Sequence, residues 1–99
     1  MKYKISAEAL KDIENIWLYT SETWSSRQAD RYYNLIMDEI EYIIQNPLAG
    51  KDYSHIRKGY LRTRVKSHFI FYKVNLKENV VQIIRILHQQ MDIDQRLND

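Results

Sequence analysis

The stretch VVQIIRILH, residues 80–88, decides how this chain folds. If these residues form a strand, apolar side chains lie on both of its faces, which is typical of a strand covered on each side. Arg85 interrupts the apolar run and His88 ends it. Because an unpaired charge is costly to bury, we expect Arg85 to be paired or functional. A histidine at a strand end is more often a hydrogen-bonded structural residue than a catalyst.

Three further strands are predicted around this stretch. Residues 68–74, HFIFYKV, are again apolar on both faces, and the turn NLKEN follows them. Residues 60–66, YLRTRVK, alternate between apolar and basic positions, which predicts a strand with one covered face. Residues 2–5, KYKI, alternate in the same way and predict a short first strand.

Two helices are predicted between the first strand and the others. Ser6 is a natural N-cap for a helix over residues 7–22. Ser25 and Gln28 form a capping box that starts a second helix, which the pair Asn46-Pro47 ends. The first helix has apolar or small positions at helical spacing, namely Leu10, Ile13, Trp17 and Thr20. The stripe of the second is longer: Ala29, Tyr33, Ile36, Met37, Ile40, Ile43 and Ile44.

These elements predict an α+β fold of one domain over residues 1–99. The order is β-α-α-β-β-β, with an antiparallel helical hairpin packed on one face of a small, mainly antiparallel sheet. Residues 46–59 form a loop that holds the only proline and both glycines. Residues 89–99 are polar, and we expect either a short helix or a flexible tail there.

The composition of the chain excludes some classes of functional site. The chain has no cysteine, which excludes cysteine catalysis and zinc–thiolate sites. The start of the chain has no apolar core of signal-peptide length and no window approaches a membrane span, so we expect a cytoplasmic protein with no membrane partner. Residues 1–52 carry six Lys/Arg against nine Asp/Glu, whereas residues 53–99 carry nine against four. The basic half should face a polyanion or an acidic partner.

Candidate site residues come mainly from that basic half. The histidines His55, His68 and His88 stand far apart in the chain, so neither a metal site nor any other cofactor is predicted. If the last three strands form a meander, four residues can converge on the sheet face away from the helices: Arg62, Arg64, Arg85 and His88. Such a group suits a metal-independent ribonuclease. The alternative is that the row of basic residues is only a solvated face.

Aromatic residues on the first helix and after it are a second candidate surface. Trp17, Tyr19 and Trp24 either pack the two helices together or, where exposed, suit a partner peptide.

Motifs along the chain resemble a known family. They are Y-x-I-S at 3–6, A-x-x-D-I-x-x-I-x-x-Y at 9–19, W-x-x-x-x-A-x-x-Y at 24–32, N-P-L-A-G at 46–50, H-F-I-F-Y at 68–72 and R-I-L-H-x-x-x-D at 85–92. Together they resemble the ParE branch of the RelE/ParE toxin superfamily of bacterial toxin–antitoxin systems. The resemblance implies the same β-α-α-β-β-β fold and an antitoxin whose C-terminal segment wraps the toxin.

The two branches of that superfamily imply different targets. ParE-type members inhibit DNA gyrase by stabilising its cleavage complex, whereas RelE-type members cleave mRNA in the ribosome with basic residues on the sheet. The net charge of +2 is modest for binding ribosomal RNA. No Tyr, Lys or second His follows His88 closely, so a RelE-like acid or base is absent unless His88 serves. Both observations favour the ParE branch.

The sequence therefore predicts the toxin of a type II toxin–antitoxin pair, a non-catalytic gyrase inhibitor neutralised by a ParD-like antitoxin. No sequence-specific nucleic-acid binding is expected. The alternatives are a RelE-like ribosome-dependent mRNA interferase, using the four residues given above, and an inactive relative that only binds its antitoxin. We expect target or partner contacts at Arg57, Arg62, Arg64, Arg85 and His88, and antitoxin contacts at Trp17, Tyr19 and Trp24.

Overall fold

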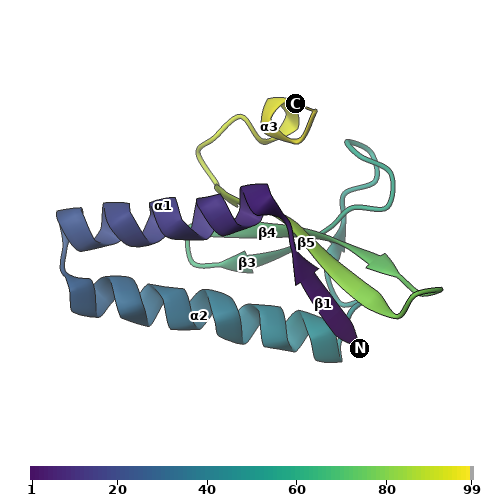
Figure 1. Ribbon diagram of the computed structural model, residues 1–99. Helices are drawn as coiled ribbons and strands as arrows, with labels where there is room; N and C mark the ends of the chain where they lie inside the picture. The colour runs from purple at the N-terminus through teal and green to yellow at the C-terminus, as the bar shows by residue number, and fades with distance from the viewer. Residues whose placement is uncertain (99) are drawn as a thin grey trace.

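In the computed structural model, which describes residues 1–98, the stretch VVQIIRILH forms strand β5, Val80–His88, inside a five-stranded sheet (Figure 1). The strand order is β1-β5-β4-β3-β2. The other strands are β1 (Lys2–Ile5), β2 (Lys51–Asp52), β3 (Leu61–Val65) and β4 (His68–Asn75). The predicted α+β fold with a mainly antiparallel sheet is confirmed.

One strand pair is parallel and joins the two ends of the chain. β1 runs beside β5 from Lys2 opposite Val80 to Ile5 opposite Ile83. All other neighbours in the sheet are antiparallel. β1 ends after four residues, so the outer edge of β5 beyond Ile83 is not covered by a strand.

Helices α1 (Ala7–Thr23) and α2 (Ser26–Gln45) form an antiparallel hairpin on one face of the sheet (Figure 1). Both predicted N-caps are confirmed. The Ser6 Oγ accepts the Ala9 N–H at 3.0 Å, and the Ser25 Oγ accepts the Gln28 N–H at 3.1 Å. These bonds satisfy amides that the first turn of a helix leaves unpaired.

The main hydrophobic core lies between the hairpin and the sheet. Its fully buried members come from both helices and from the sheet, and the largest are Ile36, Ile40, Ile43, Ile70, Tyr72 and Ile83. Two residues predicted in the helical stripes are instead exposed: Leu10 at 55% and Tyr33 at 42%. Both lie at the margin of a stripe, on the side that faces solvent.

A second, smaller core covers part of the opposite face of the sheet. Phe71 and Leu87 are buried there against Tyr60 and against Leu97, which belongs to helix α3 (Ile93–Asn98). The apolar character of both faces of β4 and β5 is thereby explained. Of the two alternatives for residues 89–99, the short helix is formed over Ile93–Asn98, and Leu97 anchors it at 4% exposure. Asp99, the last residue of that segment, lies outside the described residues.

A β-bulge in β5 interrupts the alternation of its side chains. Phe71 pairs with Arg85, but the next residue, Tyr72, pairs with Ile83, which leaves Ile84 as an extra residue. As a result Ile83 and Ile86 both pack in the main core, while Ile84 packs in the second core.

The loop predicted over residues 46–59 contains the short strand β2, which pairs with the start of β3. The loop is fastened to the sheet by one side chain. The Tyr72 hydroxyl donates to the Pro47 carbonyl at 2.9 Å and accepts the Gly50 N–H at 3.0 Å. A Cβ atom at Gly50 would overlap the same hydroxyl oxygen. Position 50 therefore requires glycine for lack of space.

We predict that Gly50→Ala lowers the free energy of unfolding by about 2 kcal/mol, because the buried tyrosine cannot move aside freely. Tyr72→Phe should cost about 1–3 kcal/mol through the two lost hydrogen bonds. Because both changes act on the same contact, the double variant should cost less than their sum in urea denaturation.

The matched control is Gly59→Ala. Its Cβ would meet only the Lys73 side chain at 3.5 Å, so its cost comes from the positive φ of 82° alone. That cost should be the same with Tyr or Phe at position 72. Strict additivity of Gly50→Ala and Tyr72→Phe would contradict the prediction.

Candidate functional site

The helical hairpin extends beyond the end of the sheet at which β3 joins β4 (Figure 1). A groove of about 840 Å³ lies in this region, within the usual size range of ligand sites. One wall comes from α1 and the start of α2, and the other from the β3–β4 turn, the end of β5 and the segment after it. We call it the hairpin groove.

Basic and aromatic side chains dominate the hairpin groove. Its acidic residues are Glu8 and Asp12, and its basic residues are Lys11, Arg31, Lys66, Arg85 and Arg96. The aromatic rings are those of Tyr19, Trp24 and Tyr32, together with the imidazoles of His68 and His88. This combination suits an acidic ligand that also offers apolar surface.

Arg85 is held by a carboxylate on α1. Its Nε donates to Asp12 Oδ2 at 2.8 Å and its Nη2 donates to Asp12 Oδ1 at 3.0 Å, which is a bidentate pair. The two side chains are only 21% and 13% exposed. The expectation that Arg85 is paired is therefore confirmed, and its charge is compensated inside the protein.

The Asp12 carboxylate also accepts a hydrogen bond from a backbone N–H at the edge of the sheet. Asp12 Oδ2 also accepts the Ile86 N–H at 2.9 Å, on the edge of β5 that β1 no longer reaches. Just before this point the Ser6 Oγ donates to the Ile84 carbonyl at 2.7 Å. Ser6 and Asp12 thus continue the hydrogen bonding of β1 with side chains from the start of α1.

Two histidines meet at the end of the sheet that faces the groove. The rings of His68 and His88 stand edge to face with centroids 5.0 Å apart. The Tyr32 hydroxyl donates to the Val65 carbonyl and lies 2.6 Å from His68 Nδ1. When the hydroxyl donates its one proton to the Val65 carbonyl, His68 Nδ1 is the donor in the shorter contact.

The protonation of His68 follows from this environment. The pKa of His68 is lowered from 6.5 to about 4, mainly by burial and to a smaller extent by the nearby His88, while Asp12 acts in the opposite sense. His68 is therefore neutral at pH 7. His88 Nδ1 accepts the Gln90 N–H at 3.1 Å, so a neutral His88 carries its proton on Nε2.

The other basic candidates lie elsewhere. The Arg62 guanidinium stacks on Phe69 at 4.2 Å, and Arg57 lies 5.9 Å from the ring centroid of Tyr60. Arg64 donates to the Lys66 carbonyl at 2.6 Å and to Gln89 Oε1 at 2.7 Å. Phe69 and Tyr60 belong to the second core, so this surface is on the sheet face away from the hairpin. We call Arg57, Arg62 and Arg64 the basic face.

The four residues Arg62, Arg64, Arg85 and His88 were expected to converge, but the structure does not bring them together in one cluster. Arg85 and His88 line the hairpin groove, whereas Arg62 and Arg64 do not. Asp12 on α1 lies at the edge of β5 and binds the Arg85 guanidinium there, away from Arg62 and Arg64. A four-residue catalytic cluster is not assembled.

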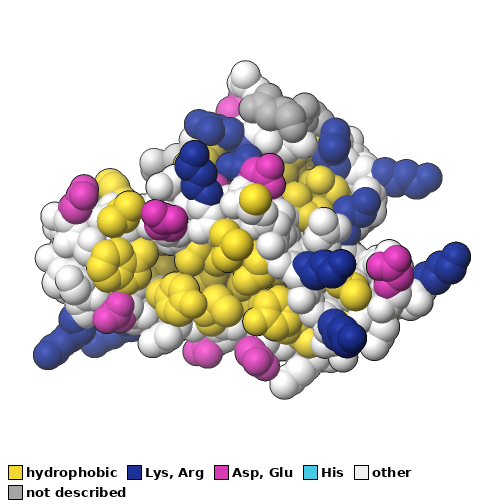
Figure 2. All heavy atoms as spheres, viewed as in Figure 1, with side chains coloured by type: hydrophobic (Ala, Val, Ile, Leu, Met, Phe, Trp, Pro, Cys, Tyr) yellow, Lys and Arg dark blue, Asp and Glu magenta, His cyan; other side chains and the backbone are white. Residues whose placement is uncertain are grey.

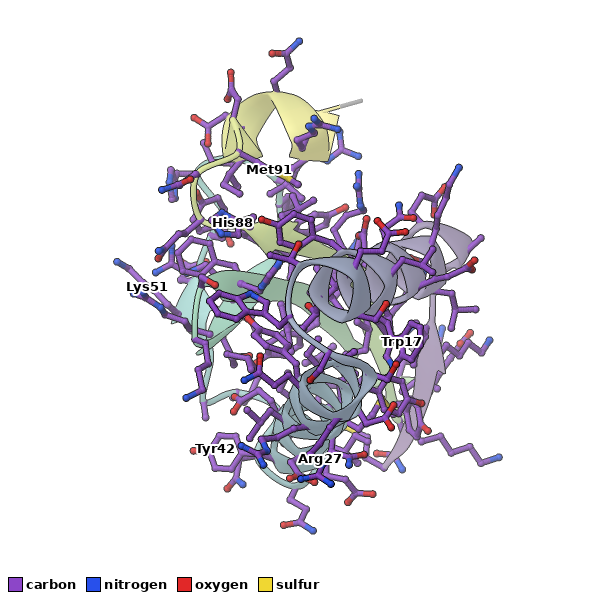
Figure 3. The ribbon with its side chains drawn as sticks, turned by 90° about the vertical axis from the view of Figure 1, so that its left-hand side faces the viewer. Trp17, Arg27, Tyr42, Lys51, His88 and Met91 are labelled. Atoms are coloured by element: carbon purple, nitrogen blue, oxygen red, sulfur yellow. The ribbon has the colours of Figure 1, made fainter. Side chains whose placement is uncertain are left out.

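The three aromatic candidates are also divided between surfaces. Tyr19 and Trp24 are 68% and 70% exposed and line the hairpin groove, so they do not pack the helices together. Trp17 donates from Nε1 to Asp30 Oδ1 at 2.9 Å and joins α1 to α2. Figure 3 shows Trp17 on the opposite side of the hairpin from His88 and Met91.

Comparison with known proteins identifies the family to which the chain belongs. A family model described as the ParE toxin of the type II toxin–antitoxin system parDE matches residues 3–93. The chain belongs to the ParE toxin family.

Relatives of the ParE family support this membership over nearly the full chain. Toxin ParE1 of Caulobacter vibrioides is 37% identical over 90 residues, which cover 91% of each chain. Toxin ParE1 of Mycobacterium tuberculosis is 34% identical over 96 residues, which cover 97% of each. A solved structure described as the chromosomal ParDE TA system from P. aeruginosa has the same fold, with a TM-score of 0.75, 17% identity, and coverage of 89% of this chain and 95% of that one.

In this ParE-family chain three residues of the groove escape detection from sequence alone. Asp12, Tyr32 and His68 each act through a partner that lies far away in the sequence. One signal was available for Asp12, because a charged residue inside an apolar strand requires an opposite charge on a neighbouring element. Tyr32 and His68 are fixed positions of the motifs at 24–32 and 68–72, but the motifs do not indicate that the two side chains contact each other.

Two further properties of the described residues bear on function. Within residues 1–98 no three His, Cys, Asp or Glu side chains are grouped as metal ligands would be. In the same range no helix has the length and apolar character needed to cross a membrane.

We predict that Asp12→Ala lowers the free energy of unfolding by about 2–4 kcal/mol, because it leaves Arg85 without its carboxylate and Ile86 with an unpaired N–H. Asp12→Asn should cost less, since its amide oxygen can still accept one of these bonds. The matched control is Glu14→Ala on the exposed side of α1, expected within about 0.5 kcal/mol of wild type. Equal, small losses for Asp12→Ala and Glu14→Ala in urea denaturation would refute this.

We predict that His68 makes stability depend on pH. Its proton is taken up near pH 6.5 in the unfolded chain but only at about pH 4 in the native one. Between these values the unfolded state binds more protons, so the free energy of unfolding falls as the pH drops from 6.5 toward 4, by up to about 3 kcal/mol.

Urea denaturation at several pH values between 4 and 7 measures this effect. His68→Gln removes the titrating group and should flatten the profile in that range. His55→Gln, in an exposed loop, retains His68 and should keep the wild-type slope. An unchanged slope in His68→Gln would show that another group is responsible.

Proposed function

We propose that this ParE-family protein is a toxin that inhibits DNA gyrase in the cytoplasm by stabilising its cleavage complex, and that a ParD-like antitoxin neutralises it. The observation that carries the non-catalytic part of the proposal is the state of Arg85. Its guanidinium donates two hydrogen bonds to Asp12, so its charge is already compensated. A transition-state phosphate would have to compete with that carboxylate.

His68 supports the same conclusion. Its pKa of about 4 keeps it neutral at pH 7, and its Nδ1 is engaged with Tyr32. A general acid needs a proton to give at the working pH, and efficient acids have a pKa close to it. The groove therefore resembles a binding site more than a bond-breaking one.

We assign the hairpin groove to the antitoxin. An acidic, amphipathic segment would pair with basic residues of the groove such as Lys11, Arg31 and Lys66, and would lay apolar side chains against Tyr19 and Trp24. Trp17, which lies on the other side of the hairpin, is left out of this assignment.

We assign the basic face to the target. Arg64 donates to the Lys66 carbonyl, and Lys66 lines the hairpin groove, so the two surfaces adjoin. A chain that fills the groove and continues past Lys66 would cover Arg64. Antitoxin binding would then block the target-binding residues directly.

The test is a DNA gyrase supercoiling assay with a parallel ribosome-dependent mRNA cleavage reaction. We expect loss of supercoiling, accumulation of cleaved plasmid and intact mRNA. The double variant Arg62→Glu/Arg64→Glu should inhibit gyrase at least about tenfold less well, because charge reversal opposes association. Arg27→Glu, at the tip of the hairpin, is the control and should inhibit like wild type (Figure 3).

Circular dichroism and thermal unfolding establish that the variants are folded. Arg85 is unsuitable for this test, since its replacement breaks the Asp12 pair. Full inhibition by the folded Arg62→Glu/Arg64→Glu variant would remove the basic face from the mechanism. Adding a ParD-like antitoxin should restore supercoiling, and should do so less effectively against Trp24→Ala.

An mRNA interferase is the second candidate function, favoured by one observation: Lys66, Arg85 and His88 line the same groove. Cut mRNA with unaffected gyrase would establish it, provided that His88→Ala abolishes the cleavage.

A further inference from the structure

The outer side of the helical hairpin carries an apolar band that no other element of residues 1–98 covers. Leu10 and Tyr33 are 55% and 42% exposed, and between them Trp17 and Met37 are half-buried. Figure 2 shows hydrophobic side chains running as a continuous band along the front of the two helices. We call these four residues the hairpin seam.

The seam is one surface because of how the helices face each other. Leu10 and Trp17 are two turns apart on α1, and Tyr33 and Met37 are one turn apart on α2. The hydrogen bond from Trp17 to Asp30, one turn before Tyr33, brings the two pairs side by side.

The seam is separate from the hairpin groove. None of its four residues lines the groove. Trp17 and His88 lie on opposite sides of the hairpin in Figure 3. A ligand in the groove therefore does not occupy the seam.

The rim of the seam is acidic. Glu14 stands on α1 between Leu10 and Trp17 at helical spacing, Asp30 precedes Tyr33 by one turn, and Glu41 follows Met37 by one turn. Acidic side chains border the apolar band along both helices in Figure 2. The hairpin residues 7–45 carry eight Asp/Glu against three Lys/Arg, which is opposite in sign to the groove.

We propose that the hairpin seam binds a helix of a partner protein whose apolar stripe is flanked by lysine and arginine. The shallow channel between two antiparallel helices accepts a third helix, as in helical bundles and helix-in-groove recognition. The apolar stripe of that helix covers Leu10 and Tyr33, while its basic flanks face Glu14 and Glu41. The proposal does not depend on the gyrase assignment, and the acidic segment assigned to the groove would be repelled here.

The probe is a synthetic helical peptide with leucine at every third or fourth position and lysine or arginine beside the stripe. A second peptide has the same leucines but glutamate in place of every basic residue. Trp24→Phe protein leaves Trp17 as the only tryptophan, so its fluorescence reports binding at the seam. We expect the basic peptide to bind at least about tenfold more tightly than the acidic one.

Variants locate the site. Leu10→Glu/Tyr33→Glu should weaken the basic peptide at least about tenfold, because both apolar anchors are lost. The matched control is Leu76→Glu, a 68% exposed residue in the turn between β4 and β5, which should bind like wild type. Glu14→Lys/Glu41→Lys should reverse the preference between the peptides.

Three results would overturn the proposal. The first is equal binding of the two peptides, and the second is undiminished binding of the basic peptide to folded Leu10→Glu/Tyr33→Glu protein. The third comes from sedimentation velocity: a wild-type dimer that dissociates in this variant would assign the seam to a second copy of the chain.

Discussion

The carboxylate of Asp12 is the constraint on which the arrangement of helices and sheet depends. It binds the guanidinium of Arg85 and the amide of Ile86 together, at the place where β1 has ended and the edge of β5 would otherwise be bare. An arginine that is mostly removed from solvent requires such a partner, and Asp12 in α1 supplies it here. Fixing α1 to β5 at this point also fixes how far the hairpin extends past the sheet. The hairpin groove is therefore a consequence of where one charge pair forms.

The secondary structure was largely predictable, because it follows from the spacing of apolar residues and from helix caps, which involve only neighbouring residues. The limits of α1 and α2 follow from Ser6, Ser25 and Asn46, and the bounds of β5 match the apolar run 80–88. Contacts between distant residues were not predictable. The Tyr32–His68 contact joins residues 36 apart in the chain. Leu97 packs on the sheet face away from the hairpin, and that surface exists only after β4 and β5 have paired.

The candidate site was predicted in part, and the errors have a physical cause. Alternation along β3 correctly placed Arg62 and Arg64 on one face. The register places Arg85 opposite Phe71, but its guanidinium turns to Asp12 at the edge of β5, a partner 73 residues away in the chain. The bulge at Ile84 is a second obstacle to prediction, because it changes which face the later residues of β5 occupy. A bulge inserts one residue and shifts every later side chain, and nothing in a single apolar run marks it. Tyr19 and Trp24 are exposed because the hairpin extends beyond the end of the sheet. That extension depends on how the helices pack on the sheet, which the local sequence does not indicate.

The parallel pairing of β1 with β5 affects how the protein is made on the ribosome. Lys2 pairs with Val80, so β1 cannot enter the sheet until β5 has been synthesised. The helical hairpin relies on contacts within one stretch of chain and can form early, whereas contacts of long sequence separation form slowly. The nascent chain therefore exposes an unpaired strand and half of a core until β5 has been synthesised. Closure of the fold, and with it any activity that needs the complete sheet, is postponed until β5 has left the ribosome.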